Sequence, residues 1–360
     1  MKTNSKKNRI KILREGIDRV DRGFVGLLEK RLRLAARIGA LKNRSGADVH
    51  APDREQQIYS QLAKYRSKLL MPEDLKNVFR EIIHLCRATQ KKFSVAYLGP
   101  EATFTHQVAA RSFGPAANYT PCRTIADVFK AVEKDTTDYG VAPLENSLEG
   151  VVHETLDTFT LSEAQIVAEH IQEISHHLLS TSGDLKKIQA VYSHPQALAQ
   201  CRRWLEKNLP GVPTYPSAST ADAAVQAAVD AKAAAIASLF AKELYHLEVA
   251  ASRIEDFSKN LTRFVVLGKK APPKTRADKT SLLFIIKDRP GALYDVLEGF
   301  KQNNINLTKI ESRPSKTKPW EYIFFMEFLG HVTDAPIKRA IARLTQMCTH
   351  LKILGSYPKA

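Results

Sequence analysis

The segment SRIEDFSKNLTRFVVLG, residues 252–268, places a polar Thr-Arg pair directly before an apolar run. The run from Phe264 to Leu267 predicts a buried strand, and such a strand holds its first residues rigidly. Thr262 and Arg263 therefore suit an anionic substrate, because a guanidinium can fix a carboxylate and a hydroxyl can pass on a proton. The tripeptide Thr262-Arg263-Phe264 also fits an exposed strand edge with an ordinary threonine. The remaining sequence distinguishes between these interpretations.

The composition predicts a globular protein of two or three domains. Of the 360 residues, 44% are hydrophobic and 26% are charged, as expected of a chain with a sizeable core. The basic N-terminus lacks the apolar centre of a signal peptide, and no apolar run approaches the roughly 18 residues of a membrane span. The cysteines Cys86, Cys122, Cys201 and Cys348 are scattered. They predict reduced thiols in a cytoplasmic protein without a metal site.

Positive charge is concentrated in the N-terminal region. The formal net charge is +16, and residues 1–92 hold 23 Lys and Arg against 10 Asp and Glu. Such an excess indicates either nucleic acid or a small anionic substrate. The basic residues are spread through amphipathic helices, with few aromatic residues and no nucleic-acid motif among them. We therefore expect small anionic substrates and no nucleic acid.

The same region predicts an all-α domain. Apolar residues recur at three- and four-residue spacing over residues 8–43, which predicts one helix of about ten turns. Pro52 and Pro72 suit the first turns of two further helices, the second ending near Leu70 and the third near Gln90. So long a first helix exceeds the needs of one compact domain. We therefore expect a homodimer or higher homo-oligomer.

Two further domains follow. Residues 93–270 alternate apolar runs with helical stretches, which predicts a two-lobed α/β domain with mainly parallel strands and a cleft between the lobes. Residues 271–279, APPKTRADK, predict a linker. Residues 280–360 predict the order βαββαβ, which is the α+β ferredoxin-like plan.

Basic residues of the first predicted helix share a face. Arg31 and Lys42 are eleven residues apart, almost three full turns, whereas Arg14 points roughly a quarter-turn or more away. Polar residues that converge inside a helical bundle are costly unless a ligand pairs with them. For each residue alone, a solvated basic face is the alternative.

Residues 10–92 resemble the all-helical chorismate mutases that are fused to aromatic-biosynthesis enzymes. The matching positions are Arg14, Arg31, Lys42, Arg54, Glu55 and Gln90. The resemblance implies that Arg31 and Arg54 clamp the carboxylates of chorismate, while Arg14 reaches over from the partner subunit. The rearrangement needs a compact substrate conformer and stabilisation of negative charge on the breaking ether.

The resemblance also assigns the remaining polar residues. Lys42 and Gln90 would hydrogen-bond the ether oxygen of chorismate, and Glu55 would hold its ring hydroxyl. The sequence departs from the family at Ala51, where Asp is often found, and at the substrate-binding position Cys86, where Ser is common.

Several strand-to-helix turns of the middle domain carry hydroxyl groups. Helix N-termini bind carboxylates through free N–H groups and the helix dipole, although Ser and Thr are also ordinary helix caps. Together with the segment VAPLENSLEGVVHETLD, these turns predict a common anion pocket. Its expected residues are Thr103, Thr105, Glu145, Asn146, Ser147, Ser193, Ser219 and Thr220.

These segments and the Thr-Arg-Phe strand resemble, in order, the pattern of prephenate dehydratases over residues 94–270. The resemblance implies conversion of prephenate to phenylpyruvate with loss of carbon dioxide and water, and without a cofactor. Because the barrier lies in expelling hydroxide, the main need is a proton donor. The expected site has Thr262 as donor, Asn146, Ser193 and Gln200 as polar partners, and Arg263 and Phe264 on the substrate.

The segments DRPGALYDVLEGF and KIESRP resemble two motifs of phenylalanine-responsive ACT domains. The resemblance implies that L-phenylalanine binds between two such domains of a dimer, and Asp288 is expected to cap the following helix. The implied effector residues are Gly291, Ala292, Leu293, Glu311, Ser312, Arg313 and Pro314. A purely structural domain is the alternative.

The three resemblances together predict a bifunctional enzyme of phenylalanine biosynthesis that is inhibited by L-phenylalanine. Two other functions stay open. One is a monofunctional prephenate dehydratase whose helical domain serves dimerisation or regulation, as Ala51 and Cys86 would allow. The other is a non-enzymatic sensor of an amino acid or aromatic acid, which the shared face of Arg31 and Lys42 disfavours.

Overall fold

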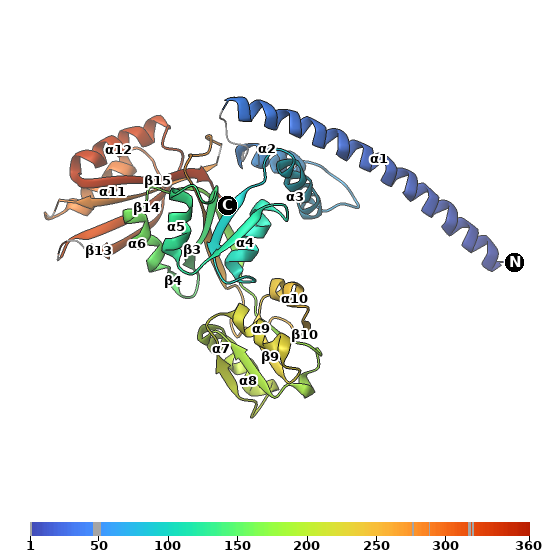
Figure 1. The fold of residues 1–360 in the computed structure, drawn as a ribbon. Helices are drawn as coiled ribbons and strands as arrows, with labels where there is room; N and C mark the ends of the chain where they lie inside the picture. The colour runs from blue at the N-terminus through green and yellow to red at the C-terminus, as the bar shows by residue number, and fades with distance from the viewer. Residues whose placement is uncertain (1, 46–51, 276, 288, 316–317, 319) are drawn as a thin grey trace. The chain divides into compact units, whose positions relative to one another are not determined.

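The computed structural model describes residues 2–45, 52–275, 277–287, 289–315, 318 and 320–360. Ala51 and the expected cap Asp288 lie outside the described residues. The chain forms two compact units, of which the first, here called the helical unit, contains Met1–Phe93 and Phe113–Ala117. The second contains Ser94–Ser112 and Asn118–Ala360 (Figure 1).

The helical unit consists of α1 (Lys2–Ser45), α2 (Pro52–Leu62) and α3 (Pro72–Ala88). The prediction of one long first helix is confirmed, but α2 ends eight residues before the predicted Leu70. The Ser67 hydroxyl accepts hydrogen bonds of 3.1 Å from the backbone N–H groups of Leu69 and Leu70. This local turn competes with the helix, and Pro72 disfavours helical backbone in the residue before it.

Most apolar residues of α1 are exposed within the helical unit. Its buried contacts with α3 are formed by Ala35, Ile82 and Cys86, with Leu28 and Leu32 packed beside them. The exposed apolar residues of α1 include Ile10, Leu13, Ile17, Val20, Phe24, Leu27, Leu34, Ile38 and Leu41.

Within the described part of the chain, every helix is too short or too polar to cross a bilayer.

The first lobe of the second unit is built on a sheet of strand order β2-β1-β3-β11-β5, with β4 beside β3. Its strands are β1 (Ser94–Leu98), β2 (Asn118–Cys122), β3 (Tyr139–Asn146), β4 (Gly150–Val151), β5 (Gln165–Glu173) and β11 (Leu261–Gly268). Its helices are α4 (Phe104–Phe113), α5 (Ile125–Glu133) and α6 (His153–Leu161). The second half of the segment 252–268 thus forms an interior strand, β11, between β3 and β5.

The second lobe has strand order β10-β6-β9-β7-β8. Its strands are β6 (His177–Ser180), β7 (Ala190–Ser193), β8 (Thr214–Pro216), β9 (Ala233–Ala237) and β10 (Glu248–Ala251). Its helices are the 3-10 helix η1 (Leu185–Lys187), α7 (Pro195–Gln200), α8 (Arg202–Asn208), α9 (Thr220–Val229) and α10 (Leu239–Tyr245).

The expectation of mainly parallel strands is wrong, because both sheets are mixed. Strand β1 pairs in parallel with β2 and β3, but β11 runs antiparallel to both β3 and β5. In the second lobe, β7 is parallel to its neighbours, whereas β6 is antiparallel to β9 and β10. Strand β11 returns from the second lobe into the first sheet, and apolar periodicity does not specify the direction of such a return.

The C-terminal domain consists of β12 (Asp278–Ile286), α11 (Ala292–Gln302), β13 (Leu307–Pro314), β14 (Tyr322–Leu329), α12 (Ala335–Met347) and β15 (Cys348–Pro358). This order confirms the βαββαβ prediction. The sheet has strand order β13-β14-β12-β15 and is antiparallel throughout. Strand β12 begins at Asp278, two residues inside the segment that the sequence predicts as a linker.

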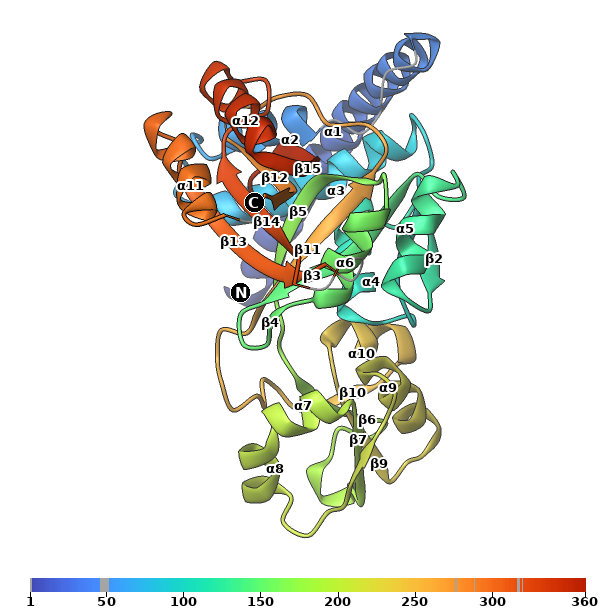
Figure 2. The same cartoon turned by 90° about the vertical axis from the view of Figure 1, so that its left-hand side faces the viewer.

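The two faces of the C-terminal sheet have different partners. Leu282 and Phe284 pack against residues of α11 and α12, including Phe300 and Leu344, and Figure 2 shows both helices on this side of the sheet. Leu283, on the opposite face, belongs to the same buried cluster as residues of the first lobe. The C-terminal sheet and the first lobe therefore share a hydrophobic core.

Close backbone contact continues this shared core. A Cβ on Gly355 of β15 would lie 2.2 Å from the backbone oxygen of Ile166 of β5. Only a residue without a side chain permits this approach. The first lobe and the C-terminal domain are thus packed directly on each other.

Candidate active sites

A cleft of about 320 Å³ lies at the ends of β3 and β11, and both lobes contribute to it. The predicted prephenate residues that line it are Thr103, Thr105, Asn146, Gln200, Ser219, Thr220, Thr262 and Phe264. These residues come from five separate segments of the sequence. The structure therefore brings most of the predicted anion pocket together; we call this the Thr262 cleft.

Thr262 is held by a neighbouring amide. Asn146 pairs with Thr262 across β3 and β11, and its Nδ2 donates a hydrogen bond of 2.7 Å to Thr262 Oγ1. The amide orientation is fixed because Asn146 Oδ1 accepts from the backbone N–H groups of Leu148 and Glu149 at 2.9 and 3.0 Å. The Thr262 oxygen acts as the acceptor in this bond, so its hydroxyl hydrogen can be donated to a ligand in the cleft.

A chain of polar side chains extends from this pair. Asn146 Nδ2 also donates to Asn260 Oδ1 at 2.7 Å, and Asn260 Nδ2 donates to Gln200 Oε1 at 3.3 Å. The ring nitrogen Nε2 of His176 lies 3.0 Å from the same Gln200 oxygen. Burial lowers the pKa of His176, more than the Gln200 bond raises it. The ring is therefore neutral at pH 7, and it orients Gln200 rather than contributing charge.

Asn260 and His176 line the cleft but were not predicted as site residues. Asn260 is only 3% exposed and stands directly before β11. His176 is 3% exposed and stands before the apolar strand β6. A polar residue at the mouth of an apolar strand was the signal available in the sequence, and it was applied to Thr262 and Arg263 but not to Asn260 or His176.

Two of the predicted hydroxyl groups at helix starts cap their helices. Ser219 is the N-cap of α9 and accepts from the backbone N–H of Asp222 at 2.9 Å. Thr103 precedes α4, donates to the Leu98 carbonyl at 3.0 Å and accepts from the His106 N–H at 3.3 Å. The hydroxyl groups thus position the helix starts, whose first N–H groups can receive a carboxylate.

Two predicted serines hold the backbone outside the cleft lining. Ser193 is fully buried and donates to the Ile236 carbonyl at 2.7 Å, which links β7 and β9. Ser147 accepts from the Leu261 N–H at 2.9 Å and donates to the Lys259 carbonyl at 3.3 Å. Both bonds stabilise segments that carry cleft residues.

Arg263 and Glu145 also lie outside the cleft lining. The Arg263 guanidinium pairs with the carboxylates of Glu145, Glu169 and Glu327 at 2.9, 3.1 and 2.9 Å. Burial opposes the charge of Arg263, but these carboxylates outweigh it, so its pKa lies above the ordinary value. Burial raises the pKa of Glu145, but the hydrogen bonds and positive charges of Lys309 and Arg263 lower it by more. The pKa of Glu145 therefore lies below its ordinary value. Both groups stay charged.

In the helical unit, Arg31 and Gln90 converge on Cys86. Arg31 Nη1 donates to Cys86 Sγ, and Gln90 Nε2 donates to the Cys86 carbonyl at 3.1 Å. Gly39 permits the approach of α1 to Gln90, since a Cβ there would lie 2.7 Å from Gln90 Cβ. Burial raises the pKa of Cys86, so its thiol is neutral and can accept from Arg31.

Glu55 has a partner that the sequence did not indicate. Its side chain is 19% exposed and lies 3.5 Å from Arg87, which is buried on α3. Burial raises the pKa of Glu55 more than Arg87 lowers it. The other matching positions differ in exposure: Arg14 and Arg54 are exposed, and Lys42 is half-buried.

The predicted effector residues occupy two elements of the C-terminal domain. Gly291 is the N-cap of α11 with φ 78°, a left-handed conformation that favours glycine. Ala292 is buried and Leu293 half-buried in the first turn. The Glu311–Pro314 segment lies on β13 at the sheet edge, where exposed and half-buried residues alternate.

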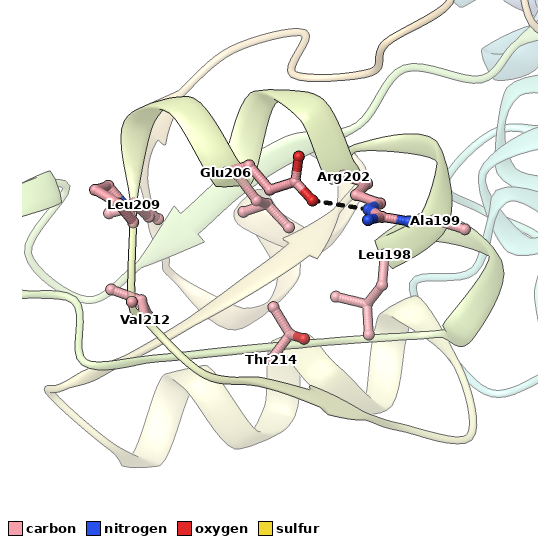
Figure 3. Close-up of a pocket in the computed structure, with 10 residues that line it drawn as sticks. Leu198, Ala199, Arg202, Glu206, Leu209, Val212 and Thr214 are labelled. Carbon is pink, nitrogen blue, oxygen red and sulfur yellow. Dashed lines mark hydrogen bonds and ion pairs between the residues drawn. The ribbon is translucent and has the colours of Figure 1, made fainter.

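A second hollow of about 550 Å³ lies beside α7, α8 and β8 (Figure 3). Its lining is largely aliphatic, and its charged side chains Arg202 and Glu206 pair with each other at 2.8 Å. None of the predicted site residues lines it. Among the described residues, no group of three or more His, Cys, Asp or Glu side chains could hold a metal ion.

Comparisons with known proteins agree with the three domains. Family models match in order: Chorismate mutase type II at residues 13–91, Prephenate dehydratase at 95–272 and the ACT domain at 280–346. The chain is 48% identical over 355 residues to the bifunctional chorismate mutase/prephenate dehydratase of Aquifex aeolicus, covering 98% of each chain. The chain belongs to the bifunctional chorismate mutase/prephenate dehydratase family.

Two further relatives support this family assignment. The bifunctional chorismate mutase/prephenate dehydratase of Pseudomonas aeruginosa is 39% identical and covers 98% of each chain. The structure of prephenate dehydratase from Arthrobacter aurescens in complex with L-Phe has a TM-score of 0.68 at 33% identity, and it covers 74% of this chain and 90% of its own. As a family member, this chain carries a chorismate mutase domain, a prephenate dehydratase domain and an ACT domain.

Proposed function

We propose that prephenate binds in the Thr262 cleft and that Thr262 donates the proton which lets the ring hydroxyl leave. The observation that carries this role is the bond from Asn146 Nδ2 to Thr262 Oγ1, since it leaves the Thr262 hydrogen available. As the bond to the departing carboxylate breaks, its electron pair enters the ring and expels the protonated hydroxyl as water. The products are carbon dioxide and the aromatic phenylpyruvate.

The other cleft residues would bind and orient prephenate. The free N–H groups at the starts of α4 and α9 suit its carboxylates, and Gln200 and Asn260 present amides towards the same space. A threonine hydroxyl is a weak acid, so the proton is replenished from solvent. Aromatisation supplies the driving force, and the cleft has to supply position and one proton.

For the mutase reaction, we propose that Arg31 and Arg54 bind the carboxylates of chorismate and that Lys42 and Gln90 stabilise the breaking ether oxygen. The convergence of Arg31 and Gln90 on Cys86 supports a shared site. Glu55 would hold the ring hydroxyl. Burial raises the pKa of Glu55, so its carboxyl group binds a proton more readily than an exposed glutamate, and in either form it can hydrogen-bond a hydroxyl group.

We propose that two copies of the chain complete the mutase site. The apolar stripe of α1 is exposed, with Phe24 50% and Leu27 69% accessible. An unpartnered stripe of this length is a typical coiled or bundled interface. Arg14, also exposed on α1, would then reach the site of the partner subunit. Sedimentation of the purified protein tests this, and a monomer at micromolar concentration would contradict it.

We propose that L-phenylalanine binds the ACT domain near Gly291–Leu293 and Glu311–Pro314 and inhibits the dehydratase. The L-Phe complex of the related Arthrobacter protein supports this choice of effector. The four cysteines are free thiols, which agrees with the cytoplasmic location that we also propose. A coupled assay that follows chorismate, prephenate and phenylpyruvate, with and without L-phenylalanine, tests both activities and their regulation together.

A further inference from the structure

Thr262 and Arg263 are adjacent on β11 but serve opposite sides of the sheet. Thr262 bonds to Asn146 and lines the cleft, whereas Arg263 bonds to Glu145 away from it. The same division applies to β3, where Asn146 and Glu145 are also adjacent. Successive side chains of a strand point to opposite faces. Thr262 and Asn146 face the cleft, and the residue next to each in the chain faces the opposite side of the sheet.

The residues on that other side form a largely buried ion cluster, in which Glu145 is half-buried. It contains the cations Arg263, Lys279 and Lys309 and the anions Glu145, Glu169 and Glu327. Lys279 lies 2.8 Å from Glu169, and Lys309 lies 2.9 Å from Glu145. Three positive and three negative groups balance each other. The side chains of Glu169, Glu327 and Lys279 are at most 9% exposed, so each depends on its partners for charge compensation.

The cluster joins the dehydratase domain to the ACT domain. Arg263, Glu145 and Glu169 belong to strands β11, β3 and β5 of the first lobe, whereas the other three groups belong to β12, β13 and β14. Arg263 therefore connects the strand that carries Thr262 with the ACT sheet. Because the domains also share a hydrophobic core, a shift of one sheet is transmitted to the other rather than absorbed by a flexible linker.

Strand β13 contacts the first lobe at two points. Lys309 reaches Glu145 of β3, and Arg313 pairs with Asp157 of α6 at 2.9 Å. Lys309 and Arg313 are four residues apart and so lie on the same face of the strand. Arg313 also belongs to the proposed effector segment. Strand β13, which would sense the effector, thus contacts Glu145, the residue that precedes Asn146 in the chain.

We propose that the ion cluster of Arg263, Glu145 and Lys309 couples the ACT domain to the catalytic pair Asn146–Thr262, and that Arg263 is a positioning residue. The inference rests on the proposed regulation by L-phenylalanine. A displacement of β13 moves Glu145 and hence Asn146, its backbone neighbour. The 2.7 Å bond to Thr262 is then lost, and the hydroxyl turns away from the substrate. Inhibition requires that the effector binds this displaced state better.

The first test compares two lysines of the ACT domain in the full-length enzyme. Lys309→Met removes the link to Glu145. Lys352→Met is the matched control, because Lys352 also bonds across the two domains, to the Phe159 carbonyl at 3.2 Å, but contacts α6 rather than β3. Dehydratase activity on prephenate is titrated with L-phenylalanine, and L-phenylalanine binding is measured by calorimetry on the same samples.

We expect the Kd of Lys309→Met for L-phenylalanine to stay within threefold of the wild-type value. The L-phenylalanine concentration for half-inhibition should rise at least tenfold. Lys352→Met should shift that concentration by less than threefold. The coupling is overturned if Lys309→Met is inhibited like the wild type or no longer binds L-phenylalanine. It is also overturned if the concentration for half-inhibition shifts equally in both variants. If Lys309→Met does not fold, Lys309→Gln replaces it. A wild-type enzyme that ignores L-phenylalanine overturns the proposed regulation and the coupling together.

The second test separates positioning from substrate binding. Arg263→Lys keeps the positive charge but loses the fork that reaches three carboxylates. We expect kcat for prephenate to fall at least tenfold with KM within threefold, and L-phenylalanine to inhibit the remaining activity less. A rise in KM of tenfold or more at unchanged kcat would make Arg263 a substrate ligand and contradict its role as a positioning residue.

Discussion

Asn146 and Thr262 face each other across β3 and β11, with the Asn146 amide nitrogen 2.7 Å from the Thr262 hydroxyl oxygen. The amide cannot turn over, because two backbone N–H groups hold its oxygen. Thr262 therefore meets a donor on one side and the open cleft on the other. This asymmetry leaves the threonine hydrogen free to point into the cleft, as the proposed role of Thr262 requires.

Asn146→Asp should abolish most dehydratase activity while keeping the side-chain shape. A carboxylate cannot donate to Thr262 Oγ1 and would instead accept the threonine hydrogen. We expect kcat for prephenate to fall by roughly 10²-fold or more, the usual contribution of a positioned acid. Steady-state kinetics measure the loss. Asn208→Asp, on an exposed part of α8, is the control, and equal activity in both variants would refute the role of the amide.

Lys42→Ala should impair the mutase and spare the dehydratase. Loss of a cationic donor to the breaking ether costs roughly 10²–10³-fold in kcat. Chorismate consumption is followed in one assay, and turnover of supplied prephenate in another. Lys30→Ala, which removes an exposed lysine of the same helix, should change neither rate. Unaltered chorismate consumption in Lys42→Ala would remove Lys42 from the site.

Gly39→Ala should lower mutase activity although it replaces no substrate-binding side chain. The new Cβ would lie 2.7 Å from Gln90 Cβ and 3.0 Å from its Cα, so Gln90 must move. A displaced donor costs roughly 10- to 100-fold in kcat/KM. Gly16→Ala on the same helix has no atom within 4 Å of the added group and should be neutral. Equal mutase rates in the two variants would show that the position of Gln90 does not matter.

The helical unit should lose stability in mild acid because of His84. Burial is the main cause that lowers the pKa of this histidine, from 6.5 to about 4. The folded state therefore resists protonation, whereas the unfolded chain binds a proton below pH 6.5. The stabilisation is complete above pH 6.5 and is lost as the pH falls towards 4. Between pH 7 and pH 5 the free energy of unfolding should fall by about 2 kcal/mol from this group.

Denaturant unfolding of the full chain at both pH values, followed by helical circular dichroism, measures this loss. His84→Gln removes the titration and should flatten the pH dependence of the helical transition. A decline of the same size in the variant and in the wild type would assign the acid sensitivity to other groups.

The order of elements was predictable because it depends on local patterns. Alternation of apolar runs and helical stretches indicated the α/β domain, and the last six elements indicated the ferredoxin-like plan. The antiparallel return of β11 was not predictable, since a strand of Phe264, Val265 and Val266 is apolar in either direction. The end of α2 at Leu62 depends on one serine turn that competes with an otherwise helical sequence.

The site was predictable in its composition but less so in its geometry. The hydroxyl groups of Thr262 and Ser193 look equivalent in sequence, yet one lines the cleft and the other bonds to a backbone carbonyl. For Arg263 a signal did exist. Adjacent residues of a strand face opposite sides, so the side chains of Thr262 and Arg263 do not face one ligand together. Only the packing of the ACT sheet reveals what Arg263 meets instead.

The most direct measurement gives chorismate to the purified Thr262→Ala variant at neutral pH and follows prephenate and phenylpyruvate over time. We predict that the variant consumes chorismate at the wild-type rate and accumulates prephenate, whereas the wild-type enzyme proceeds to phenylpyruvate. Phenylpyruvate formation by the variant at the wild-type rate would contradict the role of Thr262 as the proton donor.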